Sequence, residues 1–193
     1  LIYQNGLGVI QDDKKAIEWY QKAAAHGNVD AQYNLGLMYY NGWGVVKSYQ
    51  QAIVWYQKAA VQGRYVADAK YNLGLMYYNG WGVVKSYQQA IEWYQKAAFR
   101  GFHVENVDAQ YNLGLMYQDG LGVVRDYQEA FKCYQTAASR GHAAAQYNLG
   151  LMYKNGWGVR QDYHTSITQF QNAASQGHAD AQYNLGEMYQ NGW

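Results

Sequence analysis

The chain has 193 residues, only 15% of them are charged, and its formal net charge is +1. So weak a net charge provides no global field that would attract nucleic acid or an anionic membrane surface, and we expect neither as a partner. The single cysteine, Cys133, excludes an internal disulfide framework and a cysteine-rich zinc site. No apolar run is long enough to span a bilayer, so we expect no membrane insertion.

The chain is a tandem array of similar segments. The stretch YNLGLMYYNGWGVVKSYQQAI occurs at residues 33–53 and again at 71–91. The triplet Asn-Leu-Gly begins at positions 34, 72, 112, 148 and 184, in steps of 38, 40, 36 and 36 residues. We therefore expect a single repeat domain over residues 1–193, with about five helix-pair repeats. Because residues 1–3 align with the interior positions 37–39, we interpret the chain as a fragment of a longer array.

Each repeat begins with a predicted helix. Apolar residues at three- and four-residue spacings, such as Ala31, Leu35 and Met38, predict a helix from about Asp30 to Tyr40. Asp30 is placed to act as its N-cap.

A second helix follows a glycine-rich turn. Gly42 and Gly44 supply the permissive backbone that ends the first helix and reverses the chain. The second helix is predicted to begin near Ser48 and to end before Gly63. The equivalent N-caps are Asp12, Ser86, Asp126 and Asp162, and the equivalent stops are Gly27, Gly101, Gly141 and Gly177. The longer steps place extra residues after Gly63 (Arg-Tyr-Val-Ala) and Gly101 (Phe-His-Val-Glu-Asn-Val), where we expect surface loops.

The helix pairs must stack on one another. One pair cannot bury enough apolar surface to fold alone. Small residues such as Gly36, Ala59 and Ala60, which recur in the other repeats, allow neighbouring helices to approach closely. The sequence therefore predicts an all-α fold, a right-handed α-solenoid (superhelix) of stacked antiparallel helix pairs.

The recurring motifs are Ala-Gln-Tyr-Asn-Leu-Gly, Met-Tyr, Gly-Trp-Gly-Val and Trp-Tyr-Gln-Lys-Ala-Ala, followed by Gly. Together they closely resemble the Sel-one-like repeat family, a relative of the tetratricopeptide repeats, over the whole chain. The resemblance implies a right-handed superhelix and an adaptor role in protein assembly, bacterial signalling or host contact. The chain departs from the family in lacking the Pro that often follows the turn. It also lacks the cysteine pair of a subgroup linked to penicillin binding, so that activity does not carry over to Cys133.

Other motifs favour structural roles. The Gly-Trp-Gly turns lack the third glycine, the preceding strand and the Gly-Lys-[Ser/Thr] ending of phosphate-binding loops, so Trp43, Trp81 and Trp157 are expected to cover hairpin ends. His142 and His178 occupy equivalent positions, and we interpret them as solvated loop residues because no His, Cys and carboxylate cluster has metal-ligand spacing. We expect no metal, no cofactor and no enzymatic activity.

The remaining pattern indicates binding of a protein or peptide segment. In tetratricopeptide-like arrays, the first helix of each pair lines a concave surface, where Tyr offers contact area at low entropic cost and Asn amides can bind an extended backbone. The candidate residues are Tyr33, Asn34, Leu37, Tyr40, Tyr71, Asn72, Leu75, Tyr78, Tyr111, Asn112, Leu115, Gln118, Tyr147, Asn148, Leu151, Lys154, Tyr183, Asn184 and Glu187. The variable positions among them, namely Tyr40, Tyr78, Gln118, Lys154 and Glu187, are expected to set specificity.

Three alternatives remain. The Tyr and Asn residues can serve repeat-to-repeat packing instead of a ligand. The array can be a structural spacer, or it can self-associate through uncapped repeat ends. An RNA-reading helical repeat is less favoured, because only Lys70 and Lys154 place positive charge on the first helices.

Overall fold

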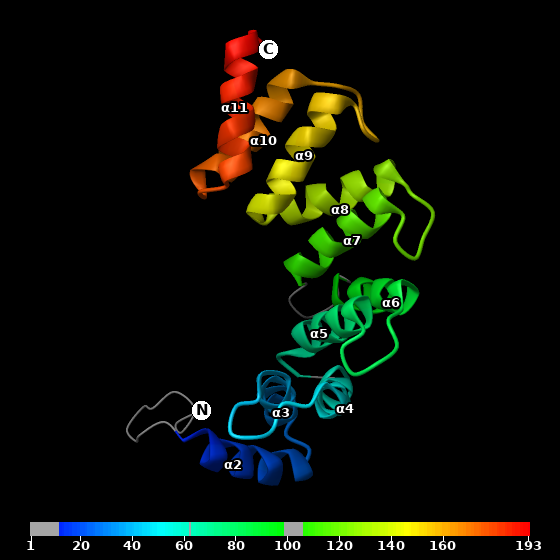
Figure 1. Cartoon of the computed structure of the whole chain (residues 1–193), viewed down its shortest axis with the longest axis vertical. Helices are drawn as coiled ribbons and strands as arrows, with labels where there is room; N and C mark the ends of the chain where they lie inside the picture. The colour runs from blue at the N-terminus through cyan, green and yellow to red at the C-terminus, as the bar shows by residue number, and fades with distance from the viewer. Residues whose placement is uncertain (1–11, 62, 99–105) are drawn as a thin grey trace. The chain divides into compact units, whose positions relative to one another are not determined.

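The computed structural model describes residues 12–61, 63–98 and 106–193, and these form ten α-helices and no strand (Figure 1). The chain divides into two compact units, Leu1–Glu105 and Asn106–Trp193, and each is considered by itself. Unit 1 contains α2 (Asp13–Ala25), α3 (Val29–Asn41), α4 (Tyr49–Ala59), α5 (Val66–Asn79) and α6 (Tyr87–Ala98). Unit 2 contains α7 (Val107–Asp119), α8 (Tyr127–Ser139), α9 (Ala143–Asn155), α10 (Tyr163–Ser175) and α11 (Ala179–Asn191). Residues 1–3, which align with part of a predicted first helix, and residues 102–105 of the loop expected after Gly101 lie outside the described residues. The last two residues of that expected loop are not a loop, because Asn106 is the N-cap of α7 and Val107 begins the helix.

Within each unit the helices pack as consecutive pairs. In unit 1, α3 packs against α4 and α5 against α6, while α2 contacts α3 and α4 contacts α5. In unit 2, α7 pairs with α8 and α9 with α10, and the contacts of α8 with α9 and of α10 with α11 join successive repeats. These contacts confirm the predicted all-α fold of stacked helix pairs.

The predicted caps are confirmed for the second helices and wrong for the first. The side chains of Asp12, Ser48, Ser86, Asp126 and Asp162 each accept a hydrogen bond from a backbone N–H in the first turn. The N-cap of α3 is Asn28 rather than Asp30, since Asn28 Oδ1 accepts from the N–H of Ala31 at 2.8 Å. Asp30 lies in the first turn, where its charge complements the helix dipole.

The turn between paired helices requires glycine for two reasons. Gly44 has a φ of +69°, a left-handed conformation that only glycine adopts at low cost. A Cβ on Gly44 would also lie 2.5 Å from the backbone of Asp13. The turn therefore packs directly on the N-terminus of the preceding second helix.

The core of each pair forms where an aromatic ring meets a glycine. In unit 1 the ring of Tyr56 packs against Gly36, and a Cβ on that glycine would lie 2.5 Å from ring carbons. The same contact joins Gly74 to Tyr94, Gly114 to Tyr134 and Gly150 to Phe170. All four rings are buried. The glycines thus allow the close helix approach that the sequence indicates.

The extra residues after Gly63 do not all form a loop. Val66 and Ala67 belong to the first turn of α5, and Val66 is buried. Tyr65 precedes the helix, and its ring stacks on Tyr33 with the ring centroids 4.6 Å apart. The expected surface loop is therefore wrong for these residues, because apolar packing draws them into the helix and its cap.

Candidate protein-binding surface

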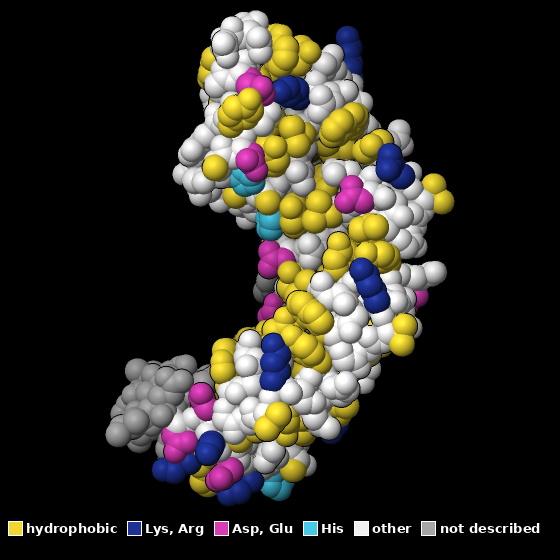
Figure 2. Space-filling view, viewed as in Figure 1, with side chains coloured by type: hydrophobic (Ala, Val, Ile, Leu, Met, Phe, Trp, Pro, Cys, Tyr) yellow, Lys and Arg dark blue, Asp and Glu magenta, His cyan; other side chains and the backbone are white. Residues whose placement is uncertain are grey.

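The candidate residues all lie on the first helices α3, α5, α7, α9 and α11, and we call the surface that they form within each unit the first-helix face. Nearly all are half-buried; Asn184 is buried and Tyr183 is exposed. Figure 2 shows hydrophobic side chains gathered in patches within each unit, with single Lys and Arg side chains beside them and a mixed cluster of charged side chains near α2. Most side chains of the first-helix face therefore remain partly exposed for contact with a partner.

The Tyr residues of the first-helix face also hold successive repeats together. Tyr33 of α3 stacks on Tyr65, which precedes the next first helix. In unit 2 the partner at this position is histidine: Tyr111 stacks on His142 and Tyr147 on His178, with ring centroids 4.5 and 4.6 Å apart. One face of each of these Tyr rings is thus covered from within the array.

The two histidines are helix caps and not the solvated loop residues expected from the sequence. His142 Nδ1 accepts a hydrogen bond from the N–H of Ala145, and His178 Nδ1 accepts one from the N–H of Ala181. His142 Nε2 also lies 3.3 Å from Asp108 Oδ1. Capping and stacking together hold both imidazole rings in place. The sequence shows only that each histidine follows a glycine, and this position does not indicate a capping role.

The Asn residues of the face contact the Tyr residues of the preceding repeat. Side-chain hydrogen bonds link Tyr33 to Asn72, Tyr111 to Asn148 and Tyr147 to Asn184. These amides therefore serve repeat-to-repeat packing, one of the alternatives that the sequence leaves open. Less of their hydrogen-bonding capacity remains for a bound backbone.

Four half-buried tyrosines of the first-helix face have a raised pKa and are neutral at physiological pH. The pKa of Tyr33 is raised to about 12, chiefly by desolvation on burial and also by the nearby charge of Asp68, and the Asn72 hydrogen bond offsets part of this rise. Burial likewise raises the pKa of Tyr40, Tyr111 and Tyr147. Their hydroxyl groups can therefore donate to a partner's carbonyl or carboxylate oxygen.

The turn end of the first-helix face is aromatic in unit 1. The ring of Tyr40 meets Tyr49 edge-on at 5.4 Å and Trp81 at 5.7 Å, and Trp81 stacks on Tyr49 at 5.6 Å. Trp81 therefore covers the hairpin end, as predicted. Trp157 stacks on Tyr127 in the same way. Trp43 and Trp157 nevertheless remain 42% and 40% exposed.

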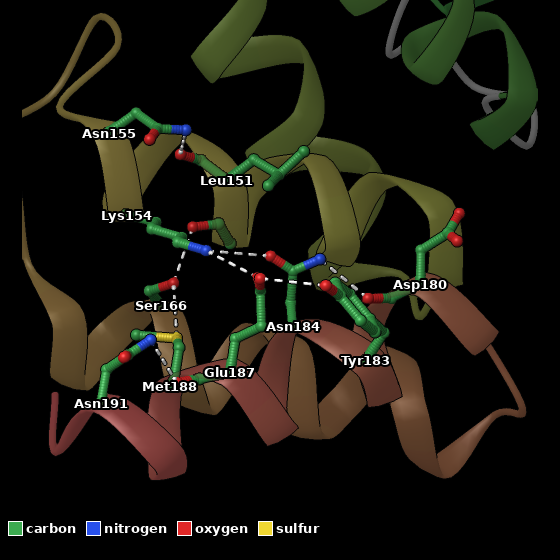
Figure 3. A network of polar contacts seen from close by, with 11 residues as sticks. Leu151, Lys154, Asn155, Ser166, Asp180, Tyr183, Asn184, Glu187, Met188 and Asn191 are labelled. Atoms are coloured by element: carbon green, nitrogen blue, oxygen red, sulfur yellow. Dashed lines mark hydrogen bonds and ion pairs between the residues drawn. The ribbon is translucent and has the colours of Figure 1, made fainter.

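A polar network occupies the same position in unit 2 (Figure 3). Lys154 Nζ of α9 lies 3.2 Å from Asn184 Oδ1 and 3.5 Å from Glu187 Oε2, both on α11. The Tyr183 hydroxyl donates to Glu187 Oε1 at 3.1 Å. Two of the variable positions, Lys154 and Glu187, therefore pair with each other across successive repeats.

Two features of the surface were not found from the sequence. Lys47 and Lys85 extend from the turns over Tyr40 and Tyr78 of the first-helix face and over Tyr49 and Tyr87 of the second helices, contacts that depend on side-chain direction. An open pocket of about 570 Å³ lies beside the turn between α9 and α10, and it contains none of the candidate residues. It is lined by Tyr153, Val159, Arg160, Gln161, Asp162 and Tyr163.

Neither a metal cluster nor a membrane span is present in the described part of the chain. No group of three or more His, Cys, Asp and Glu side chains there is arranged to hold a metal ion. None of the helices described is long and apolar enough to cross a membrane.

The chain matches the Sel1 repeat family in six stretches, which are residues 1–28, 29–63, 67–101, 107–142, 143–178 and 179–193. It therefore belongs to the Sel1 repeat family. No curated protein sequence matches the chain.

Several solved structures are similar to this one. A protective antigen of uropathogenic Escherichia coli strains that displays an SLR fold is 41% identical, with a TM-score of 0.93, over 99% of this chain and 40% of that chain. A Sel1 repeat protein from Oxalobacter formigenes is 34% identical, with a TM-score of 0.84, over 99% of this chain and 74% of that chain. An immunity protein from Pseudomonas aeruginosa is 27% identical, with a TM-score of 0.52, over 93% of this chain and 66% of that chain. The chain thus spans well under half the length of the E. coli antigen.

Proposed function

We propose that this Sel1 repeat array is a non-enzymatic scaffold that binds a peptide or protein segment along its first-helix face. Sel1 repeat proteins generally mediate protein–protein interactions and are typically not enzymes. The similarity to an immunity protein supports a protein partner in particular.

The observation that carries this proposal is that each unit has half-buried leucines at equivalent positions of its first helices. Leu37 and Leu75 are in unit 1, and Leu115 and Leu151 are in unit 2. Their neighbours one residue along, Met38, Met76, Met116 and Met152, are fully buried in the core. Since the core is already filled by the methionines, the exposed part of each leucine is available apolar area for a partner.

Peptides selected from a random library displayed on phage test the proposal. A labelled selected peptide is titrated by fluorescence anisotropy against the native chain and against a Leu37→Gln, Leu115→Gln variant. We expect at least about tenfold weaker binding to the variant, because it places a polar amide in the centre of the contact in both units. Circular dichroism checks that the variant is folded, since both leucines also contact the core.

The matched control is a Val54→Gln, Val124→Gln variant, which changes two apolar residues outside the first-helix face. Val54 is 43% exposed on α4 and Val124 is 89% exposed on a turn. Binding to this control should be unchanged. Equal losses in both variants would refute the first-helix face as the site, and failure to select any peptide would favour a spacer.

Self-association is the second candidate function, supported by α11. Tyr183 and Tyr189 are 67% and 63% exposed, and a Cβ on Gly186 would meet no atom within 4 Å. The equivalent glycines are covered by a second helix. A change of mass with concentration in light scattering, abolished by Tyr183→Glu with Tyr189→Glu, would support it.

A further inference from the structure

Unit 1 presents two similar cationic groups at the turn end of the first-helix face. Lys47 Nζ lies 4.7 Å from the ring centroid of Tyr49 and 5.9 Å from that of Tyr40. Lys85 Nζ lies 4.6 Å from the centroid of Tyr87 and 6.0 Å from that of Tyr78. We call each set of one lysine and two tyrosines a Lys–Tyr station.

The two Lys–Tyr stations share the same ring geometry. Tyr40 and Tyr49 meet edge-on with centroids 5.4 Å apart, and Tyr78 and Tyr87 do so at 5.2 Å. Cation–π contact with both rings restricts the long lysine side chain while leaving its ammonium exposed. A cation held in this way loses less rotamer entropy when it binds an anion.

These lysines have no carboxylate partner in the described part of the chain. The ion pairs found there involve Lys15, Lys132, His142 and Lys154. The sequence contains no Asp or Glu from residue 31 to 67 or from 69 to 91, the stretches that contain the stations. The positive charges of Lys47 and Lys85 are therefore uncompensated locally.

The equivalent positions in unit 2 differ in charge. Lys154, which occupies the position of Tyr40, is paired with Glu187. Arg125, which occupies the position of Lys47, lies 6.0 Å from the ring centroid of Tyr127 and is followed directly by Asp126. Among the described residues, an exposed lysine held over two tyrosine rings is thus found in unit 1.

We propose that the two Lys–Tyr stations of unit 1 bind carboxylates on an acidic, extended segment of a partner protein, with one carboxylate at each station. This inference rests on the proposed function, because it specifies the chemistry of the segment that the first-helix face binds. A nucleic acid fits less well, because Asp30 and Asp68 begin the same first helices, roughly 15 Å along the helix axis from Tyr40 and Tyr78. Those carboxylates oppose a phosphate backbone and favour basic residues on the other side of a bound peptide.

The probe is a labelled peptide of five Glu-Ser-Gly triplets, compared with the same peptide carrying Gln in place of Glu. Fluorescence anisotropy at low ionic strength should show that the Glu peptide binds the native chain about tenfold more tightly, as expected for two partly exposed ion pairs. Lys47→Met with Lys85→Met should remove this preference. Lys47→Arg with Lys85→Arg should retain it, which shows that the stations act through charge and not through folding.

The matched control is Lys58→Met with Lys96→Met, which removes the same charge from unit 1. Lys58 and Lys96 also lie over aromatic rings, 4.3 and 4.5 Å from the centroids of Trp55 and Trp93, but on second helices. The control should keep the preference for Glu. Equal effects of the two Met variants, or equal binding of the Glu and Gln peptides, would overturn the inference.

Two further outcomes separate this inference from others. If a single-stranded oligouridylate bound more tightly than the Glu peptide with the same dependence on Lys47 and Lys85, the assignment to an acidic peptide would be wrong. If library-selected peptides lost binding to the Leu37→Gln, Leu115→Gln variant but not to the Lys47→Met, Lys85→Met variant, the proposed function would stand without this inference.

Discussion

The ring of Tyr134 packs so closely against Gly114 that a Cβ on the glycine would lie 2.5 Å from Tyr134 Cε1. We predict that Gly114→Ala lowers the free energy of unfolding of unit 2 by about 1–3 kcal/mol, the usual cost of overpacking a core. The ring cannot retreat without moving α8, because Tyr134 is fully buried. Urea denaturation followed by circular dichroism measures the effect.

Gly186 provides the control within the same unit. It occupies the equivalent position on α11, where a Cβ would meet nothing within 4 Å. Gly186→Ala should therefore be neutral or stabilising by up to about 1 kcal/mol, since alanine has the higher helix propensity. Equal destabilisation by both substitutions would show that the ring contact is not the cause.

The hydroxyl groups of two equivalent core tyrosines differ in their partners. The Tyr134 hydroxyl donates to Gln118 Oε1 at 3.1 Å, whereas the buried Tyr56 hydroxyl has no hydrogen-bond partner. We predict that Tyr134→Phe destabilises by about 1 kcal/mol, while Tyr56→Phe is neutral or stabilising by about 1–2 kcal/mol. Phe170 already occupies this position in another repeat. Urea denaturation of both variants checks the difference in sign, and a loss of stability in Tyr56→Phe would contradict it.

The features that the sequence predicts correctly depend on local chemistry. Ser48 and Asp126 cap helices because their side chains reach a backbone N–H three residues away. A glycine equivalent to Gly36 recurs where the aromatic ring of the paired second helix needs space. Because each repeat carries the same local signals, the helix pairs and their stacking follow from the spacing alone.

The features that the sequence misses depend on side-chain contacts that the repeat spacing does not determine. The stacking of Tyr33 on Tyr65 joins residues of successive repeats, and it converts an expected loop into a helix cap. The position of Lys47 over Tyr40 and Tyr49 depends on rotamers that the spacing does not determine. The sequence correctly places the candidate residues on first helices, but it does not show which of them already contact other residues of the array.

The only cysteine of the chain should be unreactive in the folded protein. Cys133 is 9% exposed, and burial raises the pKa of its thiol to about 12, so little reactive thiolate forms near neutral pH. We predict slow reaction with a thiol-specific disulfide reagent at pH 8 and rapid stoichiometric reaction in urea. Rapid reaction of the native chain would mean that α8 opens frequently or that the thiol is accessible.

Tyr33 should make the stability of unit 1 sensitive to alkaline pH. Its pKa is raised from 10.0 to about 12 in the folded state, chiefly by burial. Below pH 10 both states hold the phenol proton and the stabilisation is fully present. Between pH 10 and about 12 the unfolded state ionises first, so the free energy of unfolding falls. Urea denaturation over this range should show a shallower decline in Tyr33→Phe than in the native chain, and identical slopes would argue against the raised pKa.

The ion pair between Lys154 and Glu187 should couple successive repeats of unit 2. Their side chains are only 17% and 39% exposed, and Lys154 Nζ also lies 5.3 Å from the ring centroid of Trp193. In a double-mutant cycle with Lys154→Met and Glu187→Gln, we expect a coupling energy of about 0.5–1.5 kcal/mol from urea denaturation, because partial burial limits screening by solvent. Lys132 and Glu129 give the comparison: their side chains are 66% and 42% exposed within one helix, and their coupling should stay below about 0.5 kcal/mol. Coupling no larger for Lys154 and Glu187 than for this exposed pair would mean that the contact does not link α9 to α11.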